Sequence, residues 1–263
     1  NFDFATNSNL IMTDERLDKL INVAKEFRNF DLYTSCESYG KHAEFVRHGL
    51  NYDKWKHNML RFAREAQYRN IHVMMTISAL SVWTVKDFML DILALRKQFD
   101  RKDIFSMSLN ILRFPSFQSV NMIDEFVKQQ LANDLKTFAE DKKSELTEYE
   151  YNQVLRLVSY LEKVDKAYED TDNFHSKAND LIIFLREYSE RRNMKLEDYL
   201  QIQDSAKERI FASIENMEFI DQIVSFSISK NENVLSSEYD EDIKRYVEVI
   251  RSDMITLLRM IGK

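Results

Sequence analysis

The sequence contains very little glycine, proline and cysteine. Its 263 residues include 3 glycines, 1 proline and 1 cysteine. Sandwiches and barrels of hairpins need Gly, Pro and Asn-Gly turns, so this shortage predicts a mostly helical chain. The single cysteine, Cys36, excludes a disulfide framework and any all-cysteine metal site within this chain. No apolar run reaches the roughly 18 residues that a membrane span requires.

The composition predicts a globular protein with a substantial core. Hydrophobic residues make up 44% of the chain and charged residues 31%. The net charge of −7 argues against general attraction to nucleic acid. Residues 1–125 are nearly neutral, with 17 basic and 16 acidic groups, whereas residues 126–263 carry 20 basic and 28 acidic groups. The hydrophobic pattern changes at the same place, so we expect two regions, 1–122 and 123–263.

The first region alternates strand and helix patterns. Short runs rich in β-branched and aromatic residues, which we interpret as mainly apolar strands, cover residues 2–7, 31–35, 71–78 and 104–112. Helical stripes lie between them and begin near Thr13, at Asn51 or Asp53, and near Thr84, where Thr84 and Asp87 resemble a capping box. This alternation predicts βαβ units and an α/β fold with about four parallel strands.

The second region has helical periodicity throughout. Thr147 and Glu150 form a capping-box pattern ahead of an apolar stripe. Further helices are expected over residues 173–192, 196–226 and 237–261, with a loop at 227–234. The sequence thus predicts an all-helical C-terminal region, whose simplest role is packing or partner contact.

Polar residues follow each expected strand. Ligands of parallel α/β sheets bind beyond the carboxyl ends of the strands, so these residues are the candidate site. Asn and Ser side chains both donate and accept hydrogen bonds, Glu37 suits hydroxyls or an ammonium group, and Arg113 suits a carboxylate. The candidates are Thr6, Asn7, Ser8, Asn9, Ser35, Glu37, Ser38, Thr76, Ser78, Asn110 and Arg113.

Simpler interpretations apply to the same residues. Asn, Ser and Thr at strand ends also cap helices and form turns. Cys36 could serve as a nucleophile, but the sequence offers no base nearby, and a lone cysteine is more often a small buried residue. The spacing of His42, His48 and His57 does not match a helical metal pair. No glycine-rich phosphate loop is present, which argues against a P-loop or Rossmann site.

The strand-end segments, taken in order, resemble radical S-adenosylmethionine enzymes of the subgroup that carries a twitch domain. The stretch from Phe2 to about Val120 is similar to the second half of their (βα)₆ partial barrel. Segments 6–9, 35–38 and 76–78 look like the ends of the fourth, fifth and sixth strands, where polar groups face S-adenosylmethionine. Four further segments of this chain also look like segments of that subgroup: residues 47–49, 51–55, 110–115 and 191–193.

The resemblance has one large departure. The family binds a [4Fe–4S] cluster through a CxxxCxxC loop after its first strand, and this motif is absent. The chain also opens within the strand expected at residues 2–7. We therefore expect either a fragment that lacks the cysteine-bearing half of the barrel or a degenerate relative, and an exposed sheet edge able to self-associate.

The resemblance implies a function for the parent protein. It would reductively cleave S-adenosylmethionine at the [4Fe–4S] cluster and abstract hydrogen from a substrate whose identity the sequence does not give. Residues 6–9, 35, 37, 38, 76 and 78 would bind the cofactor, with Asn110 and Arg113 nearer the substrate. The chain alone would hold neither cofactor nor cluster and would be inactive.

Two further expectations accompany this one. The resemblance implies a cytoplasmic protein of a bacterial or phage-infected cell, without nucleic acid or membrane partners. The alternative is a non-catalytic interaction or scaffold protein, an α/β platform with an acidic helical region, in which the strand-end residues are ordinary caps.

Overall fold

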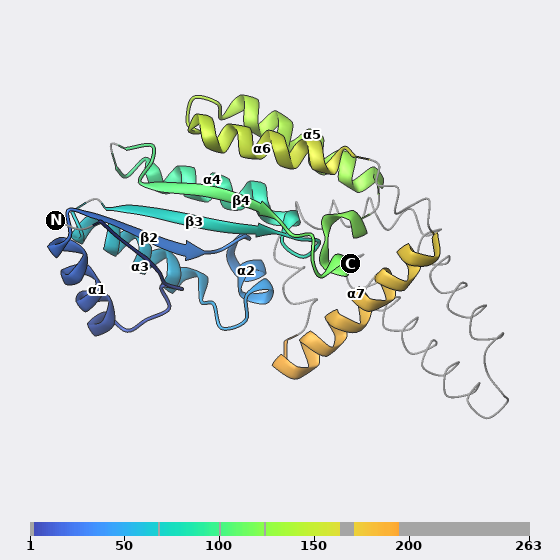
Figure 1. Cartoon of the computed structure of the whole chain (residues 1–263), viewed down its shortest axis with the longest axis horizontal. Coiled ribbons are helices and arrows are strands. Elements are labelled where there is room, and N and C mark those ends of the chain that lie inside the picture. The colour runs from blue at the N-terminus through green and yellow to red at the C-terminus, as the bar shows by residue number, and fades with distance from the viewer. Residues whose placement is uncertain (1–2, 68, 100, 124, 164–170, 195–263) are drawn as a thin grey trace. The chain divides into compact units, whose positions relative to one another are not determined.

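The computed structural model describes residues 3–67, 69–99, 101–123, 125–163 and 171–194 (Figure 1). Four strands are present in this part of the chain: β1 (Asp3–Asn7), β2 (Asn29–Ser35), β3 (Asn70–Ile77) and β4 (Phe105–Ile111). The helices are α1 (Asp14–Glu26), α2 (Gly40–Val46), α3 (Tyr52–Glu65), α4 (Val85–Arg96), α5 (Glu125–Asp141), α6 (Glu148–Leu161) and α7 (Thr171–Arg192). Short 3₁₀ turns cover Val82–Thr84, Ser116–Gln118 and Val120–Met122.

The chain divides into two compact units, residues 1–163 and 164–263. The first holds the sheet with α1 to α6. The described part of the second is α7 with the two residues that follow it, where the Arg192 guanidinium lies over the Tyr188 ring, 3.9 Å from its centroid. The helices expected over 196–226 and 237–261 lie outside the described residues.

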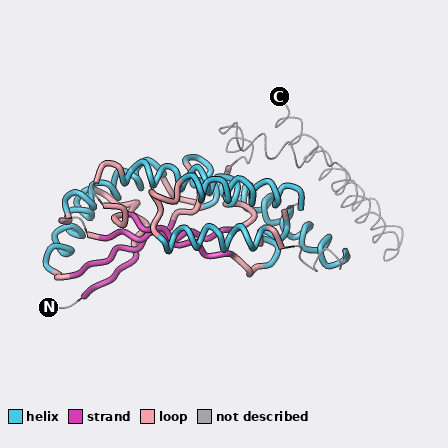
Figure 2. Tube along the Cα trace, turned by 90° about the horizontal axis from the view of Figure 1, so that it is seen from above, coloured by secondary structure: helices cyan, strands magenta, loops and turns pink. Residues whose placement is uncertain are grey.

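The four strands form one parallel sheet in the order β1-β2-β3-β4. Figure 2 shows the strands, in magenta, side by side. The expected α/β fold with four parallel strands is therefore confirmed. The register places Tyr33 of β2 beside His72 of β3, and His72 beside Ser106 of β4. Because side chains alternate along a strand, residues that are neighbours in this register point to the same face of the sheet.

One face of the sheet forms the core under α1, α3 and α4. It presents the buried residues Phe30, Leu32, Thr34, Ile71, Val73, Met75, Phe105, Met107 and Leu109. The helices contribute the apolar stripes that their sequences predict, including Leu17 and Ile21 of α1, Trp55 and Phe62 of α3, and Phe88 and Ile92 of α4. Burying each such side chain contributes about 1.5–3 kcal/mol to folding before entropy is counted.

The opposite face is polar and partly exposed, which differs from our interpretation of the strands as mainly apolar. An all-parallel sheet is usually covered on both faces, and its strands are then continuously hydrophobic. Here the strands alternate instead. The residues on the polar face are Ala5, Asn7, Asp31, Tyr33, Ser35, His72, Met74, Thr76, Ser106, Ser108 and Asn110.

Side chains from α4 and α6 form hydrogen bonds with backbone groups at the outer edge of β4. The carboxylate of Glu150 accepts a hydrogen bond from the backbone N–H of Met107, at 2.7 Å. Arg96 donates to the carbonyl oxygen of Phe105, and Arg156 donates to that of Leu109. These groups would otherwise remain unpaired at a sheet edge. The first two helices of the second expected region thus share a core with the sheet, because α6 packs on β4 and α5 packs on α6.

The helix starts follow the sequence only in part. Asn51 accepts a hydrogen bond from the backbone of Lys54, and the Thr147–Glu150 capping box is present. Thr13 precedes α1 without a side-chain cap. The capping box expected at Thr84 is wrong, because its hydroxyl accepts a hydrogen bond from the backbone N–H of Tyr39 at 3.1 Å instead.

Candidate functional site

A partly buried ion pair joins Glu37, just after β2, to Arg47, just after α2. Nη2 of Arg47 donates to both carboxylate oxygens of Glu37, at 3.0 and 3.2 Å. The Glu37 side chain is 8% exposed and that of Arg47 is 36% exposed. Burial raises the pKa of the Glu37 carboxyl above its usual range, and the Arg47 charge opposes that shift. Nε of Arg47 is buried without a hydrogen-bond partner among the described residues.

Cys36 is an inert, fully buried residue. Burial raises the pKa of its thiol far above the usual range, and the Glu37 charge adds to the shift. The sulfur donates a weak hydrogen bond to the carbonyl oxygen of Ser38, at 3.5 Å. A nucleophilic or metal-binding cysteine must be a thiolate, so this environment favours the interpretation of Cys36 as a small buried residue.

Ser38 links the loops that follow β2 and β3, and Ser78 makes hydrogen bonds within the second of these loops. The hydroxyl of Ser38 donates to the carbonyl oxygen of Ser81. The hydroxyl of Ser78 accepts from the backbone N–H groups of Leu80 and Ser81, and the Ser81 hydroxyl accepts from the backbone N–H of Ser78. Both Ser38 and Ser78 are buried, so in this structure their side chains stabilise the loops that follow β2 and β3.

Ser8 and Asn9 form local turns after β1. The hydroxyl of Ser8 accepts a hydrogen bond from the backbone N–H of Leu10, and the Asn9 side chain accepts one from Ile11. These are the two-residue turns that Ser and Asn commonly make. Thr6 is adjacent in register to the buried Leu32 and therefore points to the helix-covered face.

Four of the expected site residues share the polar face of the sheet. Asn7 ends β1, Ser35 ends β2, Thr76 lies near the end of β3 and Asn110 lies near the end of β4. Thr76 and Asn110 are direct neighbours in register. Their side chains are partly or fully exposed, which leaves their amide and hydroxyl groups open to a ligand.

The chain after β4 is open to solvent. Arg113 and Phe114 are exposed, with Phe114 86% exposed, and a cis peptide bond joins Phe114 to Pro115. Arg113 thus follows Asn110 closely in sequence, and it is exposed to solvent. Its expected role as a carboxylate contact stays a prediction.

A hydrogen-bonded chain of side chains crosses the centre of the polar face. Nδ1 of His72 lies 2.6 Å from the hydroxyl oxygen of Ser106, and Nε2 of His72 lies 3.3 Å from Oδ1 of Asp31. The Tyr33 ring stacks on the imidazole, with centroids 4.6 Å apart. Sequence reasoning missed this group, although the alternating polar positions in strands 31–35, 71–78 and 104–112 were a usable signal.

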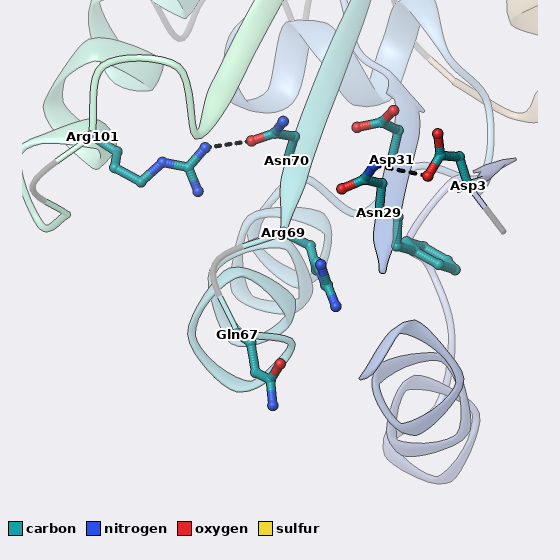
Figure 3. Close-up of a pocket in the computed structure, with 8 residues that line it drawn as sticks. Asp3, Asn29, Asp31, Gln67, Arg69, Asn70 and Arg101 are labelled. Carbon is teal, nitrogen blue, oxygen red and sulfur yellow. Dashed lines mark hydrogen bonds between the residues drawn. The ribbon is translucent and has the colours of Figure 1, made fainter. Parts of the chain in front are cut away.

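A cavity of about 370 Å³ lies at the amino ends of the strands, at the end opposite the expected site (Figure 3). Asp31 and Asn70 line it, and Arg101 donates a hydrogen bond to the Asn70 side chain. Arg69 also lines it, and Arg69 Nε is buried without a hydrogen-bond partner in the described part of the chain. The cavity wall is therefore polar and carries both signs of charge.

The structure assembles no metal centre from the residues it describes. Among them, no group of three or more His, Cys, Asp and Glu side chains is arranged to hold a metal ion. His42 is buried and its ring contacts the carbonyl oxygen of Leu80, whereas His48 and His57 are exposed.

None of the described helices is long and apolar enough to cross a membrane. Comparison of the chain with family models, curated proteins and solved structures finds no match.

Proposed function

We propose that this chain forms part of the S-adenosylmethionine-binding wall of a radical S-adenosylmethionine enzyme. The observation that supports the proposal best is the polar face of an all-parallel sheet, with Asn7, Ser35, Thr76 and Asn110 towards the carboxyl ends of its strands. A barrel interior that holds a polar ligand has this character, because helices cover only its outer face. The same proposal includes a cytoplasmic location in a bacterial or phage-infected cell.

The contacts available on this face suit the polar parts of S-adenosylmethionine. The amides of Asn7 and Asn110 and the hydroxyls of Ser35 and Thr76 can bond ribose hydroxyls and the amino acid group. The partly exposed positions of these residues leave them free to make such bonds.

The [4Fe–4S] cluster does not fit this chain. Cluster ligation needs several thiolates, and Cys36, the one cysteine of the sequence, is buried with a strongly raised pKa. We derive no reaction step through the cluster, and the cluster cysteines of the proposed enzyme would have to lie outside these 263 residues.

Ligand titration tests the binding part of the proposal. Isothermal titration with S-adenosylmethionine is carried out on the parent protein, expressed with the DNA on the 5′ side of the Asn1 codon, because this chain alone is not expected to hold the cofactor. It should show saturable binding. Asn7→Ala and Asn110→Ala should each weaken it about threefold to tenfold, as expected for one lost hydrogen bond. Asn22→Ala, an exposed asparagine of α1, is the matched control and should leave the affinity unchanged. Equal affinity in all four proteins would contradict the proposed site.

A second experiment tests the parent enzyme. The gene is expressed together with the DNA on the 5′ side of the Asn1 codon, and the product is reconstituted anaerobically with iron and sulfide. The proposal requires a CxxxCxxC motif there and formation of 5′-deoxyadenosine from S-adenosylmethionine. A product without that motif, or without cleavage activity, would remove the enzyme assignment even if the chain binds the ligand.

The alternative of an interaction or scaffold protein also has structural support. Ser8, Asn9, Ser38 and Ser78 form turns and loop contacts, as ordinary strand-end residues do. Absence of S-adenosylmethionine binding in the titration, together with an unaltered fold, would favour this alternative.

A further inference from the structure

The group at the centre of the polar face has the connectivity of an activated serine. The Asp31 carboxylate can only accept at neutral pH, so its contact with Nε2 of His72 holds the imidazole proton on that nitrogen. Nδ1 is then the basic nitrogen, and it lies 2.6 Å from the Ser106 hydroxyl, which donates to it. Apart from an exchange of the two ring nitrogens, this is the arrangement by which a base activates a serine nucleophile.

The sheet fixes this arrangement. Asp31, His72 and Ser106 come from β2, β3 and β4, three hydrogen-bonded neighbours, so the backbone ladder sets the spacing of the side chains. Stacking on Tyr33 fixes the plane of the imidazole. A group held by strands keeps its geometry better than one held by loops.

The group is also open to a solute. The side chains of His72 and Asp31 are 27% and 42% exposed, and Ser106 is partly exposed. Asp31 also forms part of the wall of the 370 Å³ cavity at the amino ends of the strands. Asp31 therefore borders both the cavity and the hydrogen-bonded chain.

We propose that Asp31, His72 and Ser106 form a serine esterase site that acts on small carboxylic esters, an activity separate from S-adenosylmethionine binding. Oγ of Ser106 attacks the ester carbonyl carbon, and its proton moves to Nδ1 of His72. The bond from carbon to the alcohol oxygen breaks, and that oxygen takes the proton from Nδ1. Water then attacks the acyl-serine and returns a proton through His72 to Oγ, which releases the carboxylic acid.

Turnover by this site should be slow. The backbone N–H of Met107, next to Ser106, is already bonded to Glu150, and Ser106 itself lies within the β3–β4 ladder. The described residues thus leave no strand amide beside Ser106 to stabilise an oxyanion. Loss of one such donor costs about 10²–10³ in rate, so the acyl-serine or a covalent inhibitor adduct is the better measurement.

The test is covalent labelling of the full chain with a fluorophosphonate, followed by peptide mass spectrometry. Oγ of Ser106 should displace fluoride from phosphorus, so the adduct should map to Ser106. Ser106→Ala should abolish the adduct, and His72→Gln should slow it about 10²-fold or more, as loss of a general base does. Ser108→Ala is the matched control, since Ser108 lies on the same strand and face and contacts Tyr149 instead; labelling should be unchanged.

Asp31 is a positioning residue in this proposal. Asp31→Asn should slow labelling, Asp31→Glu should restore part of the rate, and the ¹⁵N spectrum of the wild-type His72 ring should show the proton on Nε2. No adduct on wild-type Ser106 would overturn the proposal without any variant. An adduct that forms as fast in a folded His72→Gln protein, as judged by circular dichroism, would overturn it too.

Discussion

Arg96 of α4 and Glu150 of α6 form an ion pair whose side chains are only 5% and 1% exposed. Nη1 of Arg96 donates to Oε2 of Glu150 at 3.0 Å, and Nη2 donates to Oε1. Each partner also bonds the backbone of β4, Arg96 to Phe105 and Glu150 to Met107. The pair thereby joins two helices to one strand.

Glu150→Ala should destabilise the first unit by about 3–5 kcal/mol, because it leaves a buried guanidinium without its counter-charge. Urea denaturation measures this loss. Glu145→Ala removes a partly exposed carboxylate with lysine partners and should cost no more than about 1 kcal/mol. Similar losses for the two variants would contradict the structural role given to the buried pair.

The contribution of Glu37 to stability should fall as the pH rises. Burial raises the pKa of this carboxyl in the folded state, with Arg47 opposing the shift. The folded state then keeps a proton that the unfolded chain releases above about pH 4.3. Its stabilising effect is complete below that pH and is lost as the pH rises through the folded pKa.

The test measures the free energy of unfolding of the wild type and of Glu37→Gln from pH 4 to pH 7. The difference between the two proteins isolates the effect of this carboxyl. Wild type should lose stability relative to the glutamine variant as the pH increases. A relative gain would mean that the attraction to Arg47 outweighs the cost of burying the carboxylate.

Cys36 should resist alkylation in the folded protein. Its thiol is fully buried and its pKa is strongly raised by burial, so the reactive thiolate is scarce. Ellman's reagent should react with less than one thiol per chain in buffer over minutes and with one in denaturant. Rapid reaction in buffer would show that the loop after β2 opens.

Thr34→Val should destabilise the protein by about 1–3 kcal/mol. The Thr34 hydroxyl accepts a hydrogen bond from the indole N–H of Trp55 at 2.9 Å, and both side chains are fully buried. Valine has nearly the same shape but leaves that N–H unpaired. Thr137→Val, at an exposed site of α5, is the control and should change the unfolding midpoint little; equal effects would rule out the buried hydrogen bond as the cause.

The sequence predicted the sheet well because its signals are local. All four strands lie within two residues of their expected ends, and the apolar stripes around Trp55 and Phe88 mark the buried sides of α3 and α4. Contacts between distant segments gave no such signal. The bond from Tyr39 to Thr84 spans 45 residues and replaces a local cap, and the pairing of Arg96 with Glu150 spans 54.

For the candidate site, too, the sequence predicted local features but not contacts between distant segments. Residue type and strand order were enough to place Asn7, Ser35, Thr76 and Asn110 towards the carboxyl ends of the strands. They did not show that these four share one face, or that Ser38 and Ser78 are occupied by loop contacts. The Asp31–His72–Ser106 chain depends on lateral register between three strands, which periodicity alone does not determine. The cofactor role of the strand-end residues stays a prediction.

The two edges of the sheet differ, and this difference limits assembly. Along β4, the side chains of Glu150, Arg96 and Arg156 bond the backbone N–H of Met107 and the carbonyl oxygens of Phe105 and Leu109. By contrast, no described strand pairs with the outer edge of β1. A sheet with two open edges can add copies without limit and grow into a fibre. If the edge of β1 is the open one, as it is among the described residues, pairing of two copies through β1 would be self-complementary and would end at a closed dimer.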